Sequence, residues 1–544
     1  MKEKTNISEK YYLILLSLFL LYIGIGIFPL YCYESDSMHL IMGCSIICNQ
    51  GFTIPPIYQY EYDMQPMAYI LVPCIRHILP FLTCENIYCL LTGVATLLFI
   101  PVTIKLINYL TNLPKTIILL SLFLLPETMA IAMYPNTAIL ALCPAIFGIY
   151  AMFKNHYKTA VLLIGLAPLF RVDILILYPI VLFIFLYQDC SFKESLKKTF
   201  IIGICISVII LLGFIVLHAN PLDSTLKGYE SWNNRTPFSQ NIIAMFSFYD
   251  VINLILLPIG IVFLYKKKKY KLLMISLIPI LLNHFVYRKM GCATKHYLYM
   301  LPFVAILTGM GINYIGELLK SRNIIRYISI CCILLFIFGS VRIDYPNRPW
   351  LNAPVSESRI GPFACLFSEN RTPYKIKMGI GAGMFIRTLD EYMLLSGNAF
   401  YPLYIHNLKK QAVENREKSY CYLKNKNYNL WGYIWEMKAN LPLFLLDKGY
   451  SYHDCSDGFV LTKGKQKVHV YLDDDPSAVI NLKEREMEMK KRINSLRMKG
   501  FSFYAFCSFG TDRFMFDGQV KSGNISKITE TLYYIPAIQK DSHH

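Results

Sequence analysis

Two carboxylates and an imidazole follow the first apolar segment of the chain, which covers residues 11–30. Glu34 and Asp36 come first, and His39 lies three residues after Asp36, so Asp36 and His39 would share one face of a helix. A carboxylate at the boundary of an apolar bundle costs free energy, so it is either solvated or functional. A positioned carboxylate can take a proton from a hydroxyl group. We take Asp36 as the candidate general base, with Glu34 as its alternative, and assign Glu34 and His39 to substrate binding.

These residues open a connection over 31–84 that is unusually long. It alternates aromatic and acidic residues over 58–63, and it holds Glu61, Asp63 and Gln65 as further candidates for substrate binding. Connections longer than about 12–15 residues in a compact protein are usually functional or disordered. This one is too apolar for disorder. A solvated loop is the alternative interpretation.

Basic side chains at two other places could stabilise negative charge that develops on a leaving group. Arg171 and Asp173 interrupt an apolar stretch at a helix end, where they either contact a ligand or form a mutual ion pair. The segment 287–297 is basic and aromatic, which favours contact with a phosphate or a lipid headgroup. Arginine would grip a phosphate through two hydrogen bonds, whereas lysine would act as a point charge. The candidate substrate-binding residues of this segment are Arg288, Lys289, Lys295, His296 and Tyr297.

Composition places these residues in a polytopic α-helical membrane protein. Hydrophobic residues make up 55% of the chain, and windows of about twenty apolar residues recur, each able to cross a hydrocarbon core of roughly 30 Å. The first segment has basic flanks and no small-residue cleavage site after it, so we expect a retained signal anchor. The segment 66–82 is short and broken by prolines, which indicates an interfacial helix. About eleven crossings are predicted, at 11–30, 85–110, 115–131, 136–153, 159–171, 173–187, 199–218, 243–265, 271–287, 296–317 and 324–343.

Charge placement predicts the orientation of these crossings. The formal net charge of +18 comes largely from residues in short loops between apolar segments, as at 266–269. Every second loop is basic, and basic loops stay in the cytoplasm. We therefore expect a plasma or inner membrane protein with a cytoplasmic N terminus and, after an odd number of crossings, an extracytoplasmic tail. No zinc-finger, RRM-like or helix-turn-helix pattern accompanies the charge, which argues against a nucleic-acid partner.

The composition changes near residue 344. Residues 1–343 form the predicted transmembrane domain, and residues 344–544 form a soluble α/β-type domain that is large enough to have its own core. Within the tail, 467–472 and 501–509 are predicted strands, and 482–498 is a predicted surface helix. The sixteen cysteines of the chain show no metal-binding spacing. Four tail cysteines could pair if the tail is extracytoplasmic, in any of three connectivities: Cys365, Cys421, Cys455 and Cys507.

The arrangement resembles the GT-C superfamily of polytopic glycosyltransferases, which use polyprenyl-phosphate-linked sugars and include protein O-mannosyltransferases and lipid A aminoarabinose transferases. Three features of 10–343 match the superfamily: the acidic Asp36 that opens the first outer loop, a juxtamembrane helix that runs to Gly51, and Gln65-Pro66-Met67 before the second crossing. The segment 295–297 resembles the basic or aromatic motif that precedes a late helix in these proteins. Two features depart from the pattern, because Ser37 replaces a second acid and Gln65 stands where many relatives have lysine.

The resemblance implies an inverting membrane glycosyltransferase with an outward-facing active site between the first loop and the bundle. The prenyl chain of a polyprenyl-phosphate-sugar donor would lie against the bundle in membrane lipid, with its phosphate at the basic segment 288–296. Asp36 would deprotonate a hydroxyl group of a lipid, glycan or protein acceptor for a single displacement at the anomeric carbon. The tail would hold the acceptor or cap the site.

The resemblance also raises the question of a divalent cation, because some relatives bind one through acids of the first loop. Glu34, Asp36, Glu61 and Asp63 could supply oxygen ligands here. No second acid adjoins Asp36, so we expect a metal-independent enzyme and name no metal ligands.

Three other functional classes stay open. A transporter or flippase would show charged or interrupted helix midpoints and an internal repeat, whereas the charges here lie mostly at helix ends. A polymerase or ligase of lipid-linked glycans would have its large outer loop between late helices, whereas the large outer region here is C-terminal. A non-catalytic membrane scaffold would use the tail to bind a partner.

Overall fold

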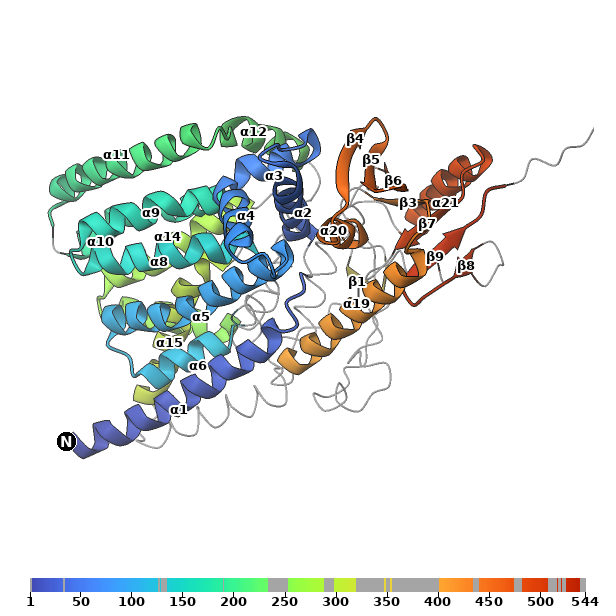
Figure 1. Ribbon diagram of the computed structural model, residues 1–544. Coiled ribbons are helices and arrows are strands. Elements are labelled where there is room, and N and C mark those ends of the chain that lie inside the picture. The colour runs from blue at the N-terminus through green and yellow to red at the C-terminus, as the bar shows by residue number, and fades with distance from the viewer. Residues whose placement is uncertain are drawn as a thin grey trace, which may run out of the picture.

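The fold is that of a helical bundle with a mixed-sheet domain packed at one of its ends (Figure 1). The computed structural model describes residues 2–32, 35–125, 128, 135–188, 190–232, 253–287, 298–318, 347–348, 353–354, 401–433, 440–473, 482–506, 516, 520 and 525–538.

The bundle is built from apolar helices that follow the predicted segments. Its members are α1 (Lys2–Ile27), α5 (Cys84–Thr111), α6 (Lys115–Phe123), α8 (Thr137–Phe153), α9 (Tyr157–Phe170), the 3-10 helix η2 (Val172–Leu177), α10 (Ile180–Tyr187), α11 (Phe192–Val216), the helix Asn253–Lys266, α14 (Tyr270–Tyr287) and α15 (Leu301–Leu318). Among the described residues, four helices are long and apolar enough to cross a membrane: Cys84–Thr111, Phe192–Val216, Tyr270–Tyr287 and Leu298–Leu318. The predicted segment 324–343 lies outside the described residues, so the number of eleven crossings stays a prediction.

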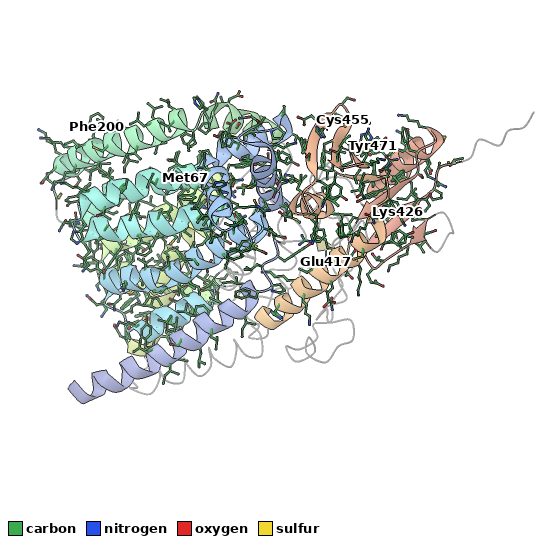
Figure 2. The ribbon with its side chains drawn as sticks, viewed as in Figure 1. Met67, Phe200, Glu417, Lys426, Cys455 and Tyr471 are labelled. Atoms are coloured by element: carbon green, nitrogen blue, oxygen red, sulfur yellow. The ribbon has the colours of Figure 1, made fainter. Side chains whose placement is uncertain are left out.

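The surface of α11 shows why the bundle needs a lipid environment. This helix leaves most of its apolar side chains uncovered, including Phe200 at 68% and Val216 at 72% exposure. Figure 2 shows Phe200 on this outermost helix. Soluble monomers rarely expose a continuous apolar surface of this kind. Together with the fold, the apolar helices support an integral membrane protein.

Glycines let two bundle helices touch backbone to backbone. A Cβ atom added at Gly311 of α15 would lie 2.3 Å from the carbonyl oxygen of Leu256, and one added at Gly260 would lie 2.0 Å from that of Leu307. The helix Asn253–Lys266 and α15 therefore approach too closely for any side chain at these positions, as small residues permit in membrane bundles.

This close approach predicts that Gly311→Ala destabilises the bundle by about 1–3 kcal/mol, the usual cost of overpacking. The measurement is the melting temperature of the detergent-solubilised protein. Gly203→Ala is the matched control, because nothing lies within 4 Å of a Cβ atom added at Gly203. Equal melting of the two variants would contradict the close approach.

The connections at the two ends of the bundle differ in charge. We call the end next to the sheet domain the domain-facing end; α1 ends there and α5 begins there (Figure 1). At the opposite end, the Lys115 ammonium lies 5.3 Å from the centre of the Tyr12 ring, and Lys267 pairs with Glu317 at 3.0 Å. The predicted basic loops therefore gather at one end of the bundle. Which side of the membrane each end occupies stays a prediction.

Four short helices of the first connection, together with the helix α12, cover the domain-facing end. They are α2 (Ser35–Gln50), η1 (Pro56–Tyr58), α3 (Gln59–Met64), α4 (Pro66–Ile78) and α12 (Pro221–Trp232). The predicted juxtamembrane helix up to Gly51 is confirmed, because α2 ends at Gln50 and Gly51 has φ +87°. A Cβ atom added at Gly43 would lie 2.4 Å from the Tyr69 ring, so this glycine lets α4 pack directly on α2.

The C-terminal domain contains a seven-stranded mixed sheet with the order β4-β5-β6-β3-β7-β9-β8. Its strands are β3 (Tyr428–Tyr433), β4 (Ser451–Cys455), β5 (Gly458–Lys463), β6 (Gln466–Asp473), β7 (Phe503–Phe506), β8 (Ser526–Lys527) and β9 (Leu532–Ile535), and its helices are α19 (Tyr401–Leu423), α20 (Asn440–Asp447) and α21 (Leu482–Met498). The central β3 is parallel to β6 and β7, and the remaining pairs are antiparallel. A separate short pair joins β1 (Asn347–Arg348) and β2 (Ala353–Pro354).

These elements confirm the predicted α/β character of the tail. The predicted strands overlap β6 and β7, and the predicted helix coincides with α21. Phe459 and Leu461 alternate with half-buried residues along β5 and are fully buried, as expected for a strand with one face on a core. Of the tail cysteines, Cys421 and Cys455 are free thiols, whereas Cys365 and Cys507 lie outside the described residues.

Buried charges join the sheet domain to the bundle. Arg416 of α19 donates to Glu85 of α5 at 2.9 Å, and its guanidinium lies 4.9 Å from the ring centre of Tyr31. Lys409 donates to the carbonyl oxygens of Gly26 and Ile27 at 3.0 and 3.1 Å. Arg416 and Glu85 are both nearly inaccessible, so removing one partner would leave an uncompensated buried charge. The contact therefore fixes the sheet domain on the domain-facing end.

A second contact joins α2 and α4 to the sheet domain. Asn49 donates to the carbonyl oxygens of Leu446 and Tyr450 at 3.0 and 3.2 Å, and Gln50 donates to that of Tyr452 at 2.7 Å. Arg76 of α4 lies 3.4 Å from Asp447 at the end of α20. Burial raises the pKa of the Asp447 carboxyl to about 7.

The raised pKa of Asp447 predicts a pH-dependent stability. Between about pH 4 and pH 7 the folded protein holds a proton on this carboxyl that the unfolded chain has released, so stability falls as the pH rises. Asp447→Asn removes this proton linkage. The melting temperature of the variant relative to the original protein is expected to increase from pH 4 to pH 7 and to level off above it. A constant difference across this range would contradict the assignment.

Candidate active site

A polar network at the domain-facing end is centred on Arg171 and Asp173. Arg171 follows the last turn of α9 in an extended conformation, with φ −166° and ψ 119°, which ends the helix and begins η2. Its Nε atom donates to both carboxylate oxygens of Asp173 at 3.0 Å. Its Nη1 atom donates to Asn136 Oδ1 at 3.2 Å and to Thr137 Oγ1 at 3.4 Å. The predicted ion pair is therefore present, within a larger network.

Two tyrosines from other helices complete the surroundings of Asp173. Tyr287, the last residue of α14, donates to Asp173 Oδ2 at 3.0 Å, and Tyr299 donates to Oδ1 at 2.5 Å. Together with Arg171 they supply hydrogen bonds to both carboxylate oxygens, which fixes the position of the carboxylate and the direction of the guanidinium. Tyr287 and Tyr299 also flank the segment 288–297 in the sequence.

Gln65 connects this network to the first connection. It lies between α3 and α4, is 6% exposed, and accepts a 2.5 Å hydrogen bond from Thr137 at the start of α8. Asn136 caps the same helix, because its side chain accepts from the backbone amide of Ala138 at 2.7 Å. The structure thus brings three predicted residues together: Gln65, Arg171 and Asp173.

The start of α2 lies beside this network. Ser37 donates to the carbonyl oxygen of Pro135 at 2.8 Å, and the residue after Pro135 accepts from Arg171. Tyr88 of α5 donates to the Ser37 hydroxyl at 2.9 Å. Asp36 belongs to the first turn of α2, directly before Ser37, although its side chain is outside the described atoms.

His39 of α2 and Glu61 of α3 form a second polar pair. His39 Nδ1 lies 3.1 Å from Glu61 Oε1, and the two residues are 0% and 6% exposed. The Tyr58 ring meets the imidazole edge-on at 6.4 Å. Glu61 Oε2 is buried and has no hydrogen-bond partner among the described residues. Since an unsatisfied buried oxygen is costly, this atom is available to a donor from a ligand or from water.

Asp63 is engaged in holding α12. Its Oδ1 accepts from Gln59 at 2.9 Å and from the backbone amide of Asn220 at 3.0 Å, and its Oδ2 accepts from Ser224 at 2.8 Å. These donors come from α3 and from the start of α12. The structure therefore gives Asp63 a positioning contact, and its predicted contact with substrate stays a prediction.

The remaining predicted site residues lie outside the part of the chain that the structure describes. They are Glu34, Arg288, Lys289, Lys295, His296 and Tyr297. Sequence reasoning, in turn, missed the hydrogen-bonding partners Asn136, Thr137, Tyr287 and Tyr299. For Tyr287 and Tyr299, their position beside the basic segment was a usable signal. Asn136 and Thr137 had no such signal in the sequence.

Comparison with known proteins identifies the fold. No protein-family model matches the sequence, and no curated protein matches it either. A solved structure does: the crystal structure of ArnT from Cupriavidus metallidurans in the apo state has 10% sequence identity and a TM-score of 0.55, over 97% of this chain and 98% of that chain. The chain shares the fold of ArnT.

The similarity to ArnT extends over the bundle and the sheet domain together. The structure of ArnT from Cupriavidus metallidurans bound to undecaprenyl phosphate aligns with 9% identity and a TM-score of 0.53, again over 97% of this chain and 98% of that chain. The expected architecture of a helical bundle followed by a sheet domain is therefore confirmed, and it is the fold of ArnT.

Proposed function

We propose that the protein is a membrane glycosyltransferase that transfers a sugar from a polyprenyl-phosphate-linked donor to a hydroxyl group of a lipid, glycan or protein acceptor. The ArnT fold over nearly the whole chain supports this class, and ArnT itself has been crystallised with undecaprenyl phosphate. The observation that carries the proposal is the hydrogen-bonded path from Ser37 through 135–136 to Arg171. It joins the start of α2, where Asp36 lies, to the half-buried Arg171 guanidinium.

In the proposed reaction, Asp36 acts as the general base. The acceptor hydroxyl loses its proton to the Asp36 carboxylate while its oxygen bonds to the anomeric carbon, and the bond from that carbon to the donor phosphate breaks. Inversion at the anomeric carbon follows from this single displacement. Glu34 is the alternative base, and His39, Glu61 and Asp63 belong to the proposed substrate-binding surface of the first connection.

Positive charge near Arg171 would stabilise the departing phosphate. Bonds from Nε and Nη1 to Asp173, Asn136 and Thr137 hold the Arg171 guanidinium in place, so in this proposal it presents a fixed positive charge to an oxygen of the ligand. Arg288 follows Tyr287 directly, and Lys289, Lys295, His296 and Tyr297 lie between the two tyrosines that bind Asp173. A set of preorganised cations at this position is what a phosphate leaving group needs. The reaction itself requires no divalent cation in this proposal.

The proposal places residues 1–343 in the transmembrane catalytic domain and residues 344–544 in an extracytoplasmic domain, in a plasma or inner membrane with a cytoplasmic N terminus. The direct contacts of Lys409 and Arg416 with the domain-facing end support a tail that covers the site.

Binding of the carrier lipid tests this proposal. The purified protein in lipid nanodiscs is incubated with undecaprenyl phosphate or with undecaprenol, and bound lipid is identified by native mass spectrometry. We expect retention of the phosphorylated lipid and not of the alcohol, because the proposed contacts are made to the phosphate. Equal retention of both lipids, or of neither, would contradict the proposal.

A further inference from the structure

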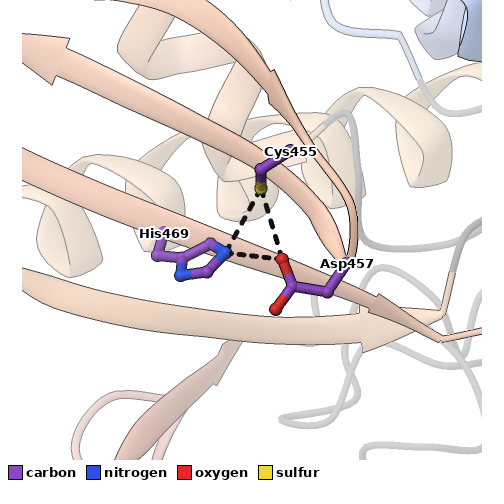
Figure 3. Close-up of side chains that lie close together, drawn as sticks. All are labelled: Cys455, Asp457 and His469. Atoms are coloured by element: carbon purple, nitrogen blue, oxygen red, sulfur yellow. Dashed lines mark hydrogen bonds and ion pairs between the residues drawn. The ribbon is translucent and has the colours of Figure 1, made fainter.

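Three side chains of the C-terminal domain meet on the outer face of its sheet. Cys455 is the last residue of β4, Asp457 lies in the turn between β4 and β5, and His469 lies on β6 (Figure 3). Cys455 Sγ lies 3.3 Å from Asp457 Oδ1 and 3.4 Å from His469 Nε2. His469 Nε2 lies 3.0 Å from Asp457 Oδ1. None of these residues belongs to the candidate active site.

The arrangement differs from that of a catalytic relay. In a relay of acid, imidazole and nucleophile, the acid contacts one ring nitrogen and the nucleophile contacts the other. Here the thiol and the carboxylate both contact Nε2 of His469. Three atoms that can each bind a metal therefore surround one common point, as Figure 3 shows.

The separations suit a tetrahedral zinc ion. With Zn–S of about 2.3 Å and Zn–N or Zn–O of about 2.0–2.1 Å, tetrahedral geometry separates sulfur from nitrogen or oxygen by about 3.5 Å, and nitrogen from oxygen by about 3.3 Å. The observed separations of 3.3, 3.4 and 3.0 Å are within a few tenths of an ångström of these values. A small outward movement of the side chains would admit the ion.

The sheet itself builds the cluster. Cys455 pairs with Gly458 across β4 and β5, and Gly458 pairs with Tyr471 across β5 and β6. Gly458 has φ +151°, and a Cβ atom added to it would lie 1.9 Å from the carbonyl oxygen of Val470. Only glycine fits there, so no side chain separates Cys455 from β6. The His469 ring packs on Tyr471 with a centroid distance of 4.0 Å, which fixes its direction.

We propose that Cys455, Asp457 and His469 bind a zinc ion, with a fourth position open to water. Thiolate, imidazole and carboxylate are the three ligand types that zinc uses in proteins. Cys455 and His469 are half-buried and Asp457 is exposed, so the site can be reached from solvent. The ion would tie β4 to β6. Because Tyr452 of β4 accepts the hydrogen bond from Gln50, the ion would also stiffen the strand that contacts α2.

The test is zinc binding by the complete, purified protein after treatment with EDTA. Titration with zinc chloride, followed by calorimetry and by metal analysis after desalting, is expected to give one zinc ion per chain. Cys455→Ser and His469→Gln are each expected to weaken binding at least tenfold. Cys421→Ser is the matched control, because Cys421 is an exposed free thiol on α19. Absence of zinc uptake, or uptake unchanged in both site variants, would overturn the proposal.

Cobalt provides a spectroscopic signal that depends on whether a cysteine thiolate coordinates the metal. Co²⁺ bound at the site should show the ultraviolet charge-transfer absorption of a cobalt–thiolate bond, and Cys455→Ser should remove it while Cys421→Ser retains it. Melting curves of the metal-free variants establish that they are folded before these comparisons. Zinc should raise the melting temperature of the original protein and not that of His469→Gln, since binding to the folded state alone stabilises it. Cobalt absorption that persists in Cys455→Ser would also overturn the assignment.

Discussion

Asp36→Asn is expected to lower the proposed sugar transfer by about 10²–10⁴-fold, which is the usual contribution of a general base. Asparagine keeps the size and polarity of the side chain but cannot accept the proton of the acceptor hydroxyl. The α2 helix should be retained, because Ser37 and Asn49 hold it through their own hydrogen bonds to Pro135 and Leu446. The measurement compares the glycan and lipid profiles of cells that carry either the original gene or the variant as their only copy.

Two further variants make this comparison specific. Glu34→Gln tests the alternative base, and it should retain the product that Asp36→Asn loses, even if a lost substrate contact lowers its amount. Glu194→Gln serves as a control for expression, since Glu194 is an exposed residue at the start of α11. Loss of the product in Glu34→Gln with retention in Asp36→Asn would move the role of base to Glu34. Unchanged profiles in both, with normal protein levels, would contradict a catalytic role for this loop.

Arg171→Met is expected to destabilise the protein by about 3–5 kcal/mol, because it leaves the carboxylate of Asp173 without its charged partner. The side chains of Arg171 and Asp173 are only 15% and 21% exposed, so water can replace little of the lost interaction. The measurement is the melting temperature of the purified protein together with its retention of undecaprenyl phosphate. Both quantities should decrease.

The double variant Arg171→Met/Asp173→Leu separates a structural role from a role in binding. Removing both members of a buried ion pair is often close to neutral for stability, so the double variant should recover most of the melting temperature. If Arg171 also contacts the donor phosphate, lipid retention should stay low in the double variant. Recovery of lipid retention along with stability would show that the pair is purely structural.

The sequence predicted the helices well because their signal is local. The predicted crossing over 85–110 differs from α5 by one residue at each end, since the apolar window lies within the segment itself and the capping residue Thr83 directly precedes the helix. The predicted crossing over 173–187 is instead divided into η2 and α10. Pro179 lacks an amide hydrogen to donate to the preceding turn, so the chain ends one helix and begins another there.

The polar contacts of the site were harder to predict because they join distant parts of the chain. Arg171 and Asp173 could be selected as charges that interrupt an apolar segment. Their partners Asn136 and Tyr287 are ordinary polar residues in sequence, and only the packing of α8, α9 and α14 brings them together. Polar side chains that meet in this way leave no periodic pattern.

The zinc-type cluster shows the same limit in the sheet domain. Cys455 and Asp457 are separated by one residue and lie 14 and 12 residues from His469, a spacing that matches no common metal motif. The register of β4, β5 and β6 produces the cluster, and Gly458 leaves the space for it. The absence of metal spacing among the cysteines therefore did not exclude a candidate metal site.

The proposed enzyme consumes a polyprenyl-phosphate-linked sugar in its membrane and depends on Asp36 as the base. The most direct measurement is the amount of intact polyprenyl-phosphate-linked sugars, quantified by mass spectrometry, in membranes of cells that carry either the original protein or Asp36→Asn. We predict that one such lipid accumulates in the variant while its sugar disappears from the acceptor fraction. Equal amounts of every polyprenyl-phosphate-linked sugar in the two membranes, at equal protein levels, would contradict the claim.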